Sequence, residues 1–195
     1  MRKSKIFLGL ICLLATLFNN TVQGAVIPET ECICNCTCET EAPVSDIRSS
    51  AVQLAESQIG IAEATGKNDG ADVLKYQKST GNTTGDQWCA SFVAWVLKNS
   101  GVIQTGNAYS PTWFTATTTI YKPSTNLNHT PRAGDVFGVW VQSKGRVGHV
   151  GLIAEWGDKE VLCIEGNYSD KVVKQRRLTR QIYVASDWIE NQSTI

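Results

Sequence analysis

The segment VGHVGLIAEWGDKEVLCIEGNY, residues 147–168, decides the fold class of this chain. Its two halves are apolar runs of the length and composition of β-strands. The Gly157-Asp158 pair between them is typical of a tight turn. The segment therefore predicts an antiparallel hairpin, with a pairing sum near 314 that places residue 149 opposite residue 165.

The flanking sequence extends this hairpin into a sheet and places helices before it. After Pro123 the apolar period is two, which predicts further strands over 136–141, 172–178 and 182–188. Before Pro123 the period is 3.6. Helices are predicted from a cap at Ser45 or Asp46 to Gly60, over 72–78, from a cap at Asp86 to Gly101, and over 110–117. This order predicts an α+β domain, with N-terminal helices packed on a C-terminal antiparallel sheet.

The hairpin brings together an imidazole and a carboxylate. His149 shares one strand face with Gly151, and the predicted register places Glu165 opposite His149 on that face. Both groups are costly to bury without a polar partner. They are therefore predicted to face each other, although a buried core histidine is an alternative interpretation of His149. His129, in a polar loop, is expected to be exposed.

A cysteine opens the best-defined predicted helix. Cys89 lies in its first turn, where unpaired backbone N–H groups stabilise a thiolate. The alternative is a small buried apolar side chain. With His149 and Glu165, Cys89 completes the residue types of an activated nucleophile: a thiol, a base and an acid that orients the base. A backbone N–H near Cys89 would help to bind an oxyanion, with Gln87 or Asn82 as candidates for a second donor.

Four motifs in order resemble the CHAP domain, a papain-like superfamily of cysteine amidases and endopeptidases allied to the NlpC/P60 peptidases. They are WCASFV at 88–93, PRAGDV at 131–136, GHVG at 148–151 and IEGN at 164–167, and the resemblance covers roughly residues 52–187. It implies a papain-like, NlpC/P60-like fold, with Cys89 as nucleophile, His149 as base, Glu165 as third member and Asn167 as a supporting polar residue. It also implies a hydrolase of peptidoglycan or its stem peptides, either an N-acetylmuramoyl-L-alanine amidase or a stem or cross-bridge endopeptidase.

Two other functions stay open from the sequence. One is an acyltransferase or transglutaminase-like enzyme that uses the same nucleophile, because the triad chemistry is shared between hydrolysis and transfer. The other is a non-catalytic cell-wall-binding module on the same fold. The intact set of Cys89, His149 and Glu165 argues against the binding module.

The first 44 residues differ from the rest of the chain. Residues 1–24 predict a cleavable signal peptide, with cations, an apolar run over 6–18 and small residues before a cleavage after Gly24. Residues 25–44 form a tail or linker that carries Cys32, Cys34, Cys36 and Cys38. Disulfides, including bonds between chains, and a soft-metal site are alternatives for these thiols. The hydrolase domain then spans 45–190. We expect a secreted or periplasmic protein with no stable membrane insertion after signal removal.

The remaining features weigh against other classes. The formal net charge is zero, which does not favour a nucleic-acid partner. No cofactor or required metal is predicted, because the run 68–72 lacks the ligand spacing of a calcium loop and turn chemistry explains it. Cys163 is expected to be a buried structural thiol. A basic stretch is interpreted as a solvated strand face, with attraction to acidic cell-wall polymer as the alternative; its members are Lys171, Lys174, Arg176, Arg177 and Arg180.

Overall fold

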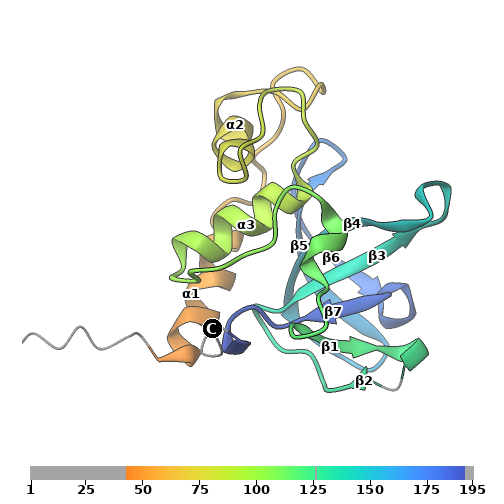
Figure 1. Ribbon diagram of the computed structural model, residues 1–195. Coiled ribbons are helices and arrows are strands. Elements are labelled where there is room, and N and C mark those ends of the chain that lie inside the picture. The colour runs from red at the N-terminus through yellow and green to blue at the C-terminus, as the bar shows by residue number, and fades with distance from the viewer. Residues whose placement is uncertain (1–42, 126, 192–195) are drawn as a thin grey trace, which may run out of the picture. The chain divides into compact units, whose positions relative to one another are not determined.

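Three α-helices come first in the computed structural model, which describes residues 43–125 and 127–191 of the chain (Figure 1). They are α1 (Val44–Glu56), α2 (Ala71–Lys78) and α3 (Cys89–Asn99). None of the helices in these ranges is long and apolar enough to cross a membrane. The predicted signal peptide and the tail with Cys32, Cys34, Cys36 and Cys38 lie outside the described residues.

The predicted helix caps are wrong. Ser45 and Asp46 lie inside α1, whose N-cap is Pro43. Trp88 is the N-cap of α3, and the Asp86 carboxylate instead accepts the backbone N–H of Thr83 at 2.9 Å. Both helices therefore begin without a side-chain cap hydrogen bond. For α3 this leaves the backbone N–H groups of its first turn without a capping acceptor.

The fourth predicted helix is shorter than expected. It is a 3-10 helix, η1, that spans Ser110–Trp113 and ends before Thr117. Beyond it the hydroxyls of Thr115 and Thr118 bond each other at 2.8 Å and also accept nearby backbone N–H groups. Such local side-chain bonds offer the backbone an alternative to helix, which explains the early end.

One antiparallel sheet of seven strands follows within the described residues, in the order β2-β1-β7-β3-β4-β5-β6. The strands are β1 (Thr119–Lys122), β2 (Leu127–Asn128), β3 (Val136–Val141), β4 (Arg146–Glu155), β5 (Glu160–Tyr168), β6 (Lys171–Leu178) and β7 (Val184–Ser186). The predicted α+β class, with helices before an antiparallel sheet, is confirmed. The prediction missed β1 and β2, and β7 pairs with β3 and β1.

The β4–β5 hairpin forms, but its register differs from the prediction by two residues. Leu152 pairs with Ile164 and Ile153 with Cys163, a sum of 316 instead of 314. The turn occupies residues 156–159, and a bulge lies between Ile153 and Glu155. His149 and Glu165 are therefore diagonal neighbours and not direct partners. A shift of two residues preserves the strand face, so both side chains still share one face.

Both faces of the sheet are covered by apolar side chains. α3 packs on β4 and β5, and the core on that side includes Val150 and Ile164. A smaller cluster on the opposite face includes Phe137, Ile153 and Cys163. Alternation along the strands therefore divides the core in two. The site described below lies where α3 begins and the β4–β5 ladder ends.

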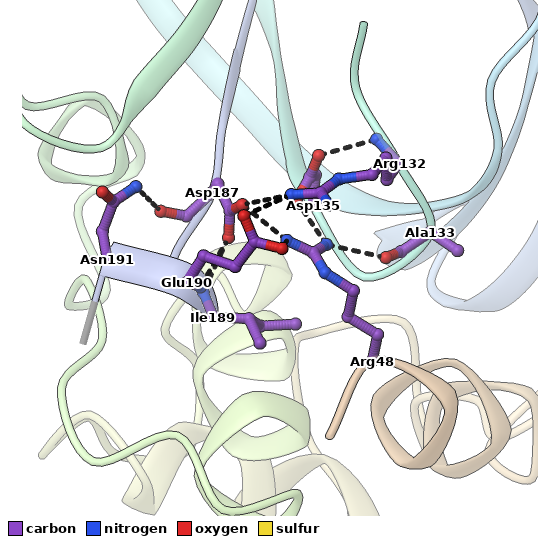
Figure 2. Close-up of polar contacts among 8 residues, drawn as sticks. All are labelled: Arg48, Arg132, Ala133, Asp135, Asp187, Ile189, Glu190 and Asn191. Carbon is purple, nitrogen blue, oxygen red and sulfur yellow. Dashed lines mark hydrogen bonds and ion pairs between the residues drawn. The ribbon is translucent and has the colours of Figure 1, made fainter. Parts of the chain in front are cut away.

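An ion cluster with a buried centre connects α1 to the sheet and the C-terminal segment (Figure 2). The Arg48 guanidinium donates to Asp135 Oδ1 at 2.7 Å and to Asp187 Oδ2 at 2.5 Å. Arg132 reaches the same Asp187 oxygen at 3.2 Å and Glu190 Oε2 at 2.6 Å. We call these five residues the α1 ion cluster. It joins segments that are far apart in the sequence, and so it closes the fold.

Candidate active site

Cys89 is the first residue of α3 and is only 6% exposed. Its Sγ lies 3.9 Å from the hydroxyl Oγ of Ser110, which precedes Pro111 at the start of η1. The thiol also contacts His149 and the backbone N–H of Val150. The helix start supplies further N–H groups without a capping side chain. The cysteine is therefore surrounded by hydrogen-bond donors.

His149 lies on β4 between the thiol and an acid. Its Nε2 is 2.6 Å from Oε2 of Glu165, and the ring is 17% exposed. Because an imidazole has two nitrogens, this leaves Nδ1 to face Cys89. The structure thus brings together all three residues that the sequence predicted for the triad. The order of contact is Cys89, His149, Glu165, as an activated nucleophile requires.

Glycines make this approach sterically feasible. A Cβ at Gly151 would lie 2.9 Å from Cγ of Glu165, so a side chain there would displace the acid. A Cβ at Gly166 would lie 2.6 Å from Phe92 and 2.8 Å from Trp88. The start of α3 therefore sits against β5 where β5 has no side chain. Gly151 and Gly166 belong to the GHVG and IEGN motifs, and this close packing is their physical reason.

Glu165 is fully buried and accepts four hydrogen bonds. Oε2 receives Nε2 of His149 and Nη2 of Arg177, both at 2.6 Å. Oε1 receives Nε of Arg177 at 2.6 Å and Nε2 of Gln175 at 2.9 Å. Each carboxylate oxygen thus accepts two hydrogen bonds, and the planar guanidinium fixes the plane of the carboxylate.

The surroundings favour the charged form of all three residues. Burial raises the pKa of the Cys89 thiol, but contacts with His149, the Val150 N–H and Ser110 bring the pKa below its ordinary 9.0. Burial lowers the pKa of His149, but hydrogen bonds with Cys89 and Glu165 raise it to about 9. Burial also raises the pKa of Glu165, and the bonds from His149 and Arg177 bring it to about 2. The arrangement therefore shifts each of the three groups toward its charged form: a thiolate, an imidazolium and a carboxylate.

Asn167 lies on β5 two residues after Glu165, but its side chain forms a hydrogen bond outside the triad. Its side-chain amide donates to Oδ1 of Asn68 at 3.1 Å, and its backbone has a φ of +56°. The Asn68 N–H donates to Glu63 at 2.7 Å, and Glu63 also accepts the Trp88 indole N–H at 2.8 Å. This chain of bonds leads from β5 to the residue before Cys89. The geometry links Asn167 to the loop before α2 and not to the imidazole.

The candidates for a second oxyanion donor differ in position. The Gln87 side-chain oxygen accepts Nζ of Lys144 at 3.3 Å in an exposed contact. The Asn82 backbone N–H bonds the carbonyl of Gln77, which places Asn82 in the turn after α2. Neither contact directs an amide at Cys89. Ser110, which the sequence did not single out, has the closest side-chain hydroxyl to the thiol among the contacts described.

The structure places the remaining candidates away from the triad's chemistry. Cys163 is buried on the same face of β5 as Glu165, but no contact with His149 or Cys89 is described for it, and burial raises the pKa of its thiol. His129 is exposed. In the 68–72 run, Asp69 accepts two bonds from Thr65, as in a turn. The described residues contain no group of three or more His, Cys, Asp or Glu side chains arranged to hold a metal ion.

Sequence reasoning missed Arg177 and Gln175. The basic stretch was interpreted as a solvated face, which is correct for Lys174 and Arg176 but wrong for Arg177, whose side chain is 13% exposed. The signal was present in the alternation of β6. Gln175 pairs with Cys163 and Arg177 with Val161, so both share the face of Glu165. Once β6 is placed beside β5, alternation alone selects these two residues.

A buried thiol, imidazole and carboxylate at a helix start on an α+β fold define a cysteine-nucleophile type of site. Residues 79–167 match the family model of the CHAP domain. The match includes Cys89, His149, Glu165 and Asn167. The resemblance seen in the four motifs is confirmed over this segment, which matches the CHAP domain model.

Several solved structures are similar to the chain. The peptidoglycan hydrolase RipB from Mycobacterium tuberculosis is 20% identical, with a TM-score of 0.48, over 75% of this chain and 66% of that one. NlpC1 from Trichomonas vaginalis is 13% identical, with a TM-score of 0.46, over 74% and 45%. The P60 domain of an antigen from M. avium paratuberculosis is 14% identical, with a TM-score of 0.44, over 73% and 93%. The chain spans slightly less than two thirds of RipB. No curated protein matches the sequence.

Proposed function

We propose that this protein is a peptidoglycan hydrolase that cleaves an amide bond by a thiol mechanism. The observation that carries the proposal is the chain of contacts from Cys89 through His149 to Glu165, at the start of α3 and inside a segment that matches the CHAP domain. Its substrate is the glycan–peptide amide, as for an N-acetylmuramoyl-L-alanine amidase, or an amide of the stem or cross-bridge peptide.

The geometry supports a two-step displacement. The Cys89 thiolate attacks the carbonyl carbon, and the oxyanion that forms accepts hydrogen bonds from N–H groups at the start of α3. The His149 imidazolium then gives its proton to the leaving amine nitrogen, and the C–N bond breaks to leave a thioester on Cys89. In the second step neutral His149 takes a proton from water, and the hydroxide attacks the thioester. Cys89 leaves as a thiolate, and the product is a carboxylate.

Each residue has a distinct part in this scheme. Cys89 forms the covalent bond, and His149 moves protons through Nδ1. Glu165 holds Nε2, which fixes the tautomer of the ring and stabilises the imidazolium. The hydroxyl of Ser110 supports the thiolate through its contact with Sγ.

Digestion of purified peptidoglycan tests the proposal. Wild-type protein is expected to release fragments whose masses identify the amide that is cut, while Cys89→Ala releases none. Cys163→Ala is the matched control, because it removes a buried thiol outside the triad and is expected to keep the activity. Release by Cys89→Ala would show that another group is the nucleophile. Addition of an amine acceptor separates hydrolysis from acyl transfer, since transfer gives an amide product in place of a free carboxylate.

We also propose that the protein acts outside the cytoplasm, in the periplasm or after secretion. Residues 1–24 support this, because their cations, apolar run and small residues match a cleavable signal peptide. N-terminal sequencing of protein recovered from the envelope or the medium is expected to begin at Ala25. Recovery of chains that begin at Met1 from the cytosolic fraction alone would contradict the proposal.

A further inference from the structure

Four side chains of alternating charge, two of them buried and two half-buried, contact one another in a row at the site. Arg177 contacts Glu165, Glu165 contacts His149, and His149 contacts Cys89. When the thiol and imidazole carry the charges used in the proposed mechanism, the four charges are +1, −1, +1 and −1. We call this set the charge line. Its net charge is zero, which is the least costly arrangement for charges that are taken out of water.

Without Arg177, the charge line would have a net charge of −1 at a site where Glu165 is fully buried. A buried carboxylate that loses its cation relieves the cost by binding a proton. A protonated Glu165 no longer stabilises the imidazolium, and the ion pair of Cys89 and His149 then returns to its neutral form. The charge of Arg177 therefore acts on the thiol through two intermediate residues.

We propose that Arg177 is a positioning residue that keeps Glu165 ionised and oriented, and thereby keeps Cys89 as a thiolate. The inference rests on the proposed thiol mechanism. The inference goes beyond that mechanism, because it states that Arg177, a residue on β6 that does not touch the thiol, controls whether Cys89 is protonated.

The guanidinium is held in a way that suits this role. Nε and Nη2 bind the two oxygens of Glu165 as a fork, at 2.6 Å each. The rings of Tyr168 and Phe137 lie 5.3 Å and 5.8 Å from the guanidinium carbon. Lysine would keep the charge but lose the fork, because an ammonium is a single point charge. Charge and orientation can therefore be separated by mutation.

The other groups that face Glu165 are accounted for. From β6, Gln175 donates a neutral hydrogen bond to Oε1. From β5, Cys163 lies near the carboxylate, and burial together with Glu165 raises the pKa of its thiol, so that it stays neutral. Tyr168 faces both the His149 ring, at 6.3 Å, and Arg177. Arg177 is therefore the one permanent charge in contact with Glu165 in the described part of the chain.

The test is the pH dependence of Cys89 alkylation in the full chain, a readout that needs no peptidoglycan. Iodoacetamide reacts with thiolates, and mass spectrometry of the peptide that contains Cys89 separates this thiol from the others. We expect the midpoint for Arg177→Met to lie about one pH unit or more above wild type. Arg177→Lys is expected to lie between them. Arg176→Met is the matched control, because Arg176 is exposed on the same strand and is expected to leave the midpoint unchanged.

A second comparison separates positioning from general stability. In a Glu165→Gln background, Arg177→Met is expected to shift the midpoint by much less, because the residue through which it acts is gone. An unchanged midpoint in folded Arg177→Met, or an equal shift in both backgrounds, would overturn the inference. If the midpoint shifts but peptidoglycan is not cleaved by wild type, then only the proposed function fails.

A separate observation concerns a cavity of about 490 Å³ beside η1. Two cations line it, Lys122 and Arg146, and no carboxylate does. Lys122 lies over the Tyr183 ring at 5.6 Å, and the Arg146 guanidinium lies over the Tyr109 ring at 4.6 Å. Neither cation forms an ion pair with any acid of residues 43–125 and 127–191. Their charges are therefore available to an anionic ligand.

Two residues that line the cavity are close in sequence to residues of the candidate active site. Pro111 lines it, and the preceding residue is Ser110, which contacts Cys89. Val147 also lines it, two residues before His149. We infer that this cavity binds a carboxylate group of the peptide whose amide is cut, with aromatic side chains covering the peptide's apolar parts. This inference rests on the proposed function. It adds that the site prefers a substrate with a negative charge.

Binding to full-length Cys89→Ala tests this without turnover. The probe is a tetrapeptide that carries a glutamate and a free C-terminal carboxylate, compared with the same peptide amidated at both groups. We expect the free form to bind roughly tenfold tighter, and Lys122→Met or Arg146→Met to remove most of that difference. Lys159→Met, an exposed cation in the β4–β5 turn, is the control. Equal affinity of the two peptides would overturn the inference, as would a preference retained in both cavity variants. A preference that depends on the cavity, without peptidoglycan cleavage by wild type, would count only against the proposed function.

Discussion

In the α1 ion cluster Arg48 lies between Asp135 and Asp187, whereas in the charge line Arg177 lies against Glu165 alone. Both sets bury a guanidinium with carboxylates. The α1 ion cluster contains only arginines and carboxylates, and it joins three distant segments. The charge line continues into an imidazole and a thiol, whose charges can change. The comparison teaches that a buried arginine serves as a tether or as part of a reactive site according to what its carboxylate touches next.

The largest expected effect comes from breaking the tether. Arg48→Met leaves the buried carboxylates of Asp135 and Asp187 without their shared cation. We expect a loss of about 3–5 kcal/mol in the free energy of unfolding, because an unpaired buried charge is strongly destabilising. Urea denaturation measures this, and the Cys89 alkylation midpoint of the folded fraction is expected to stay at the wild-type value. A shifted midpoint would show that the two sets are coupled.

The next effect is on catalysis. Glu165→Gln removes the negative charge that supports the imidazolium, so the pKa of His149 is expected to fall from about 9 toward its ordinary 6.5. We expect kcat/KM on peptidoglycan to drop by about 10²-fold, since proton transfer by His149 depends on this support. The alkaline limb of the pH profile is expected to move to lower pH. A parallel loss at every pH, with an unmoved limb, would argue for a purely structural role of Glu165.

The two sets also differ in how pH changes their contribution to the free energy of unfolding, and this effect is smaller than the two above. Burial raises the pKa of Asp135 from 3.8 to about 6, despite the bond from Arg48. Because the folded pKa lies above the ordinary value, the stabilisation is complete below pH 3.8 and is lost as the pH rises through 6. Glu165, with a pKa lowered to about 2, has the opposite sign: its stabilisation is lost as the pH falls from 4.5 to 2. We expect each contribution to be on the order of 1–3 kcal/mol.

Chemical denaturation at a series of pH values measures both windows. Asp135→Asn is expected to be less stable overall, but to lose the decline between pH 4 and 6. Glu165→Gln is expected to keep that decline and to lose the slope below pH 4.5. If Asp135→Asn retains the decline, another group of the α1 ion cluster is the one that titrates.

The smallest expected effect is at Asn167. Asn167→Gly keeps a residue that tolerates the positive φ and removes the hydrogen bond to Asn68. We expect a loss of about 0.5–1.5 kcal/mol in the free energy of unfolding. We also expect kcat to stay within a few-fold of wild type, because the side chain binds the loop before α2. A loss of kcat above tenfold at unchanged stability would place Asn167 in the support of the triad.

The sequence is sufficient to predict that Cys89, His149 and Glu165 lie together, because the relevant signals are local. The apolar stripe after residue 88 predicts a helix with Cys89 in its first turn, and parity along one hairpin places His149 and Glu165 on one face. Residues that depend on distant pairing were not predicted. Arg177 becomes part of the site only when β6 lies beside β5 in a known register. Likewise, the short strand β1 pairs with β7, which is some sixty residues further along the chain, and β2 pairs in turn with β1, so neither strand has much local pattern.

The motif that contains Asp135 also shows what cannot be predicted from the sequence. PRAGDV helped to identify the family, but its charged members, Arg132 and Asp135, belong to the α1 ion cluster and not to the triad. A sequence motif does not show whether its residues serve catalysis or the stability of the fold. Here the ion pair with Arg48 on α1 shows that Asp135 has a structural role.

The two-residue register difference in the β4–β5 hairpin also has a consequence for how such a site tolerates change. His149 and Glu165 meet even though they are not opposite each other, because side chains of like parity share a face and long side chains reach diagonally. A turn change that slides the strands by two residues, toward direct opposition of His149 and Glu165, would therefore keep the base and the acid within reach. A slide by one would turn Glu165 into the apolar layer under α3. We therefore expect homologous chains to differ in this turn by changes that keep His149 and Glu165 on one face of the sheet. The same condition applies to a triad grafted onto another hairpin.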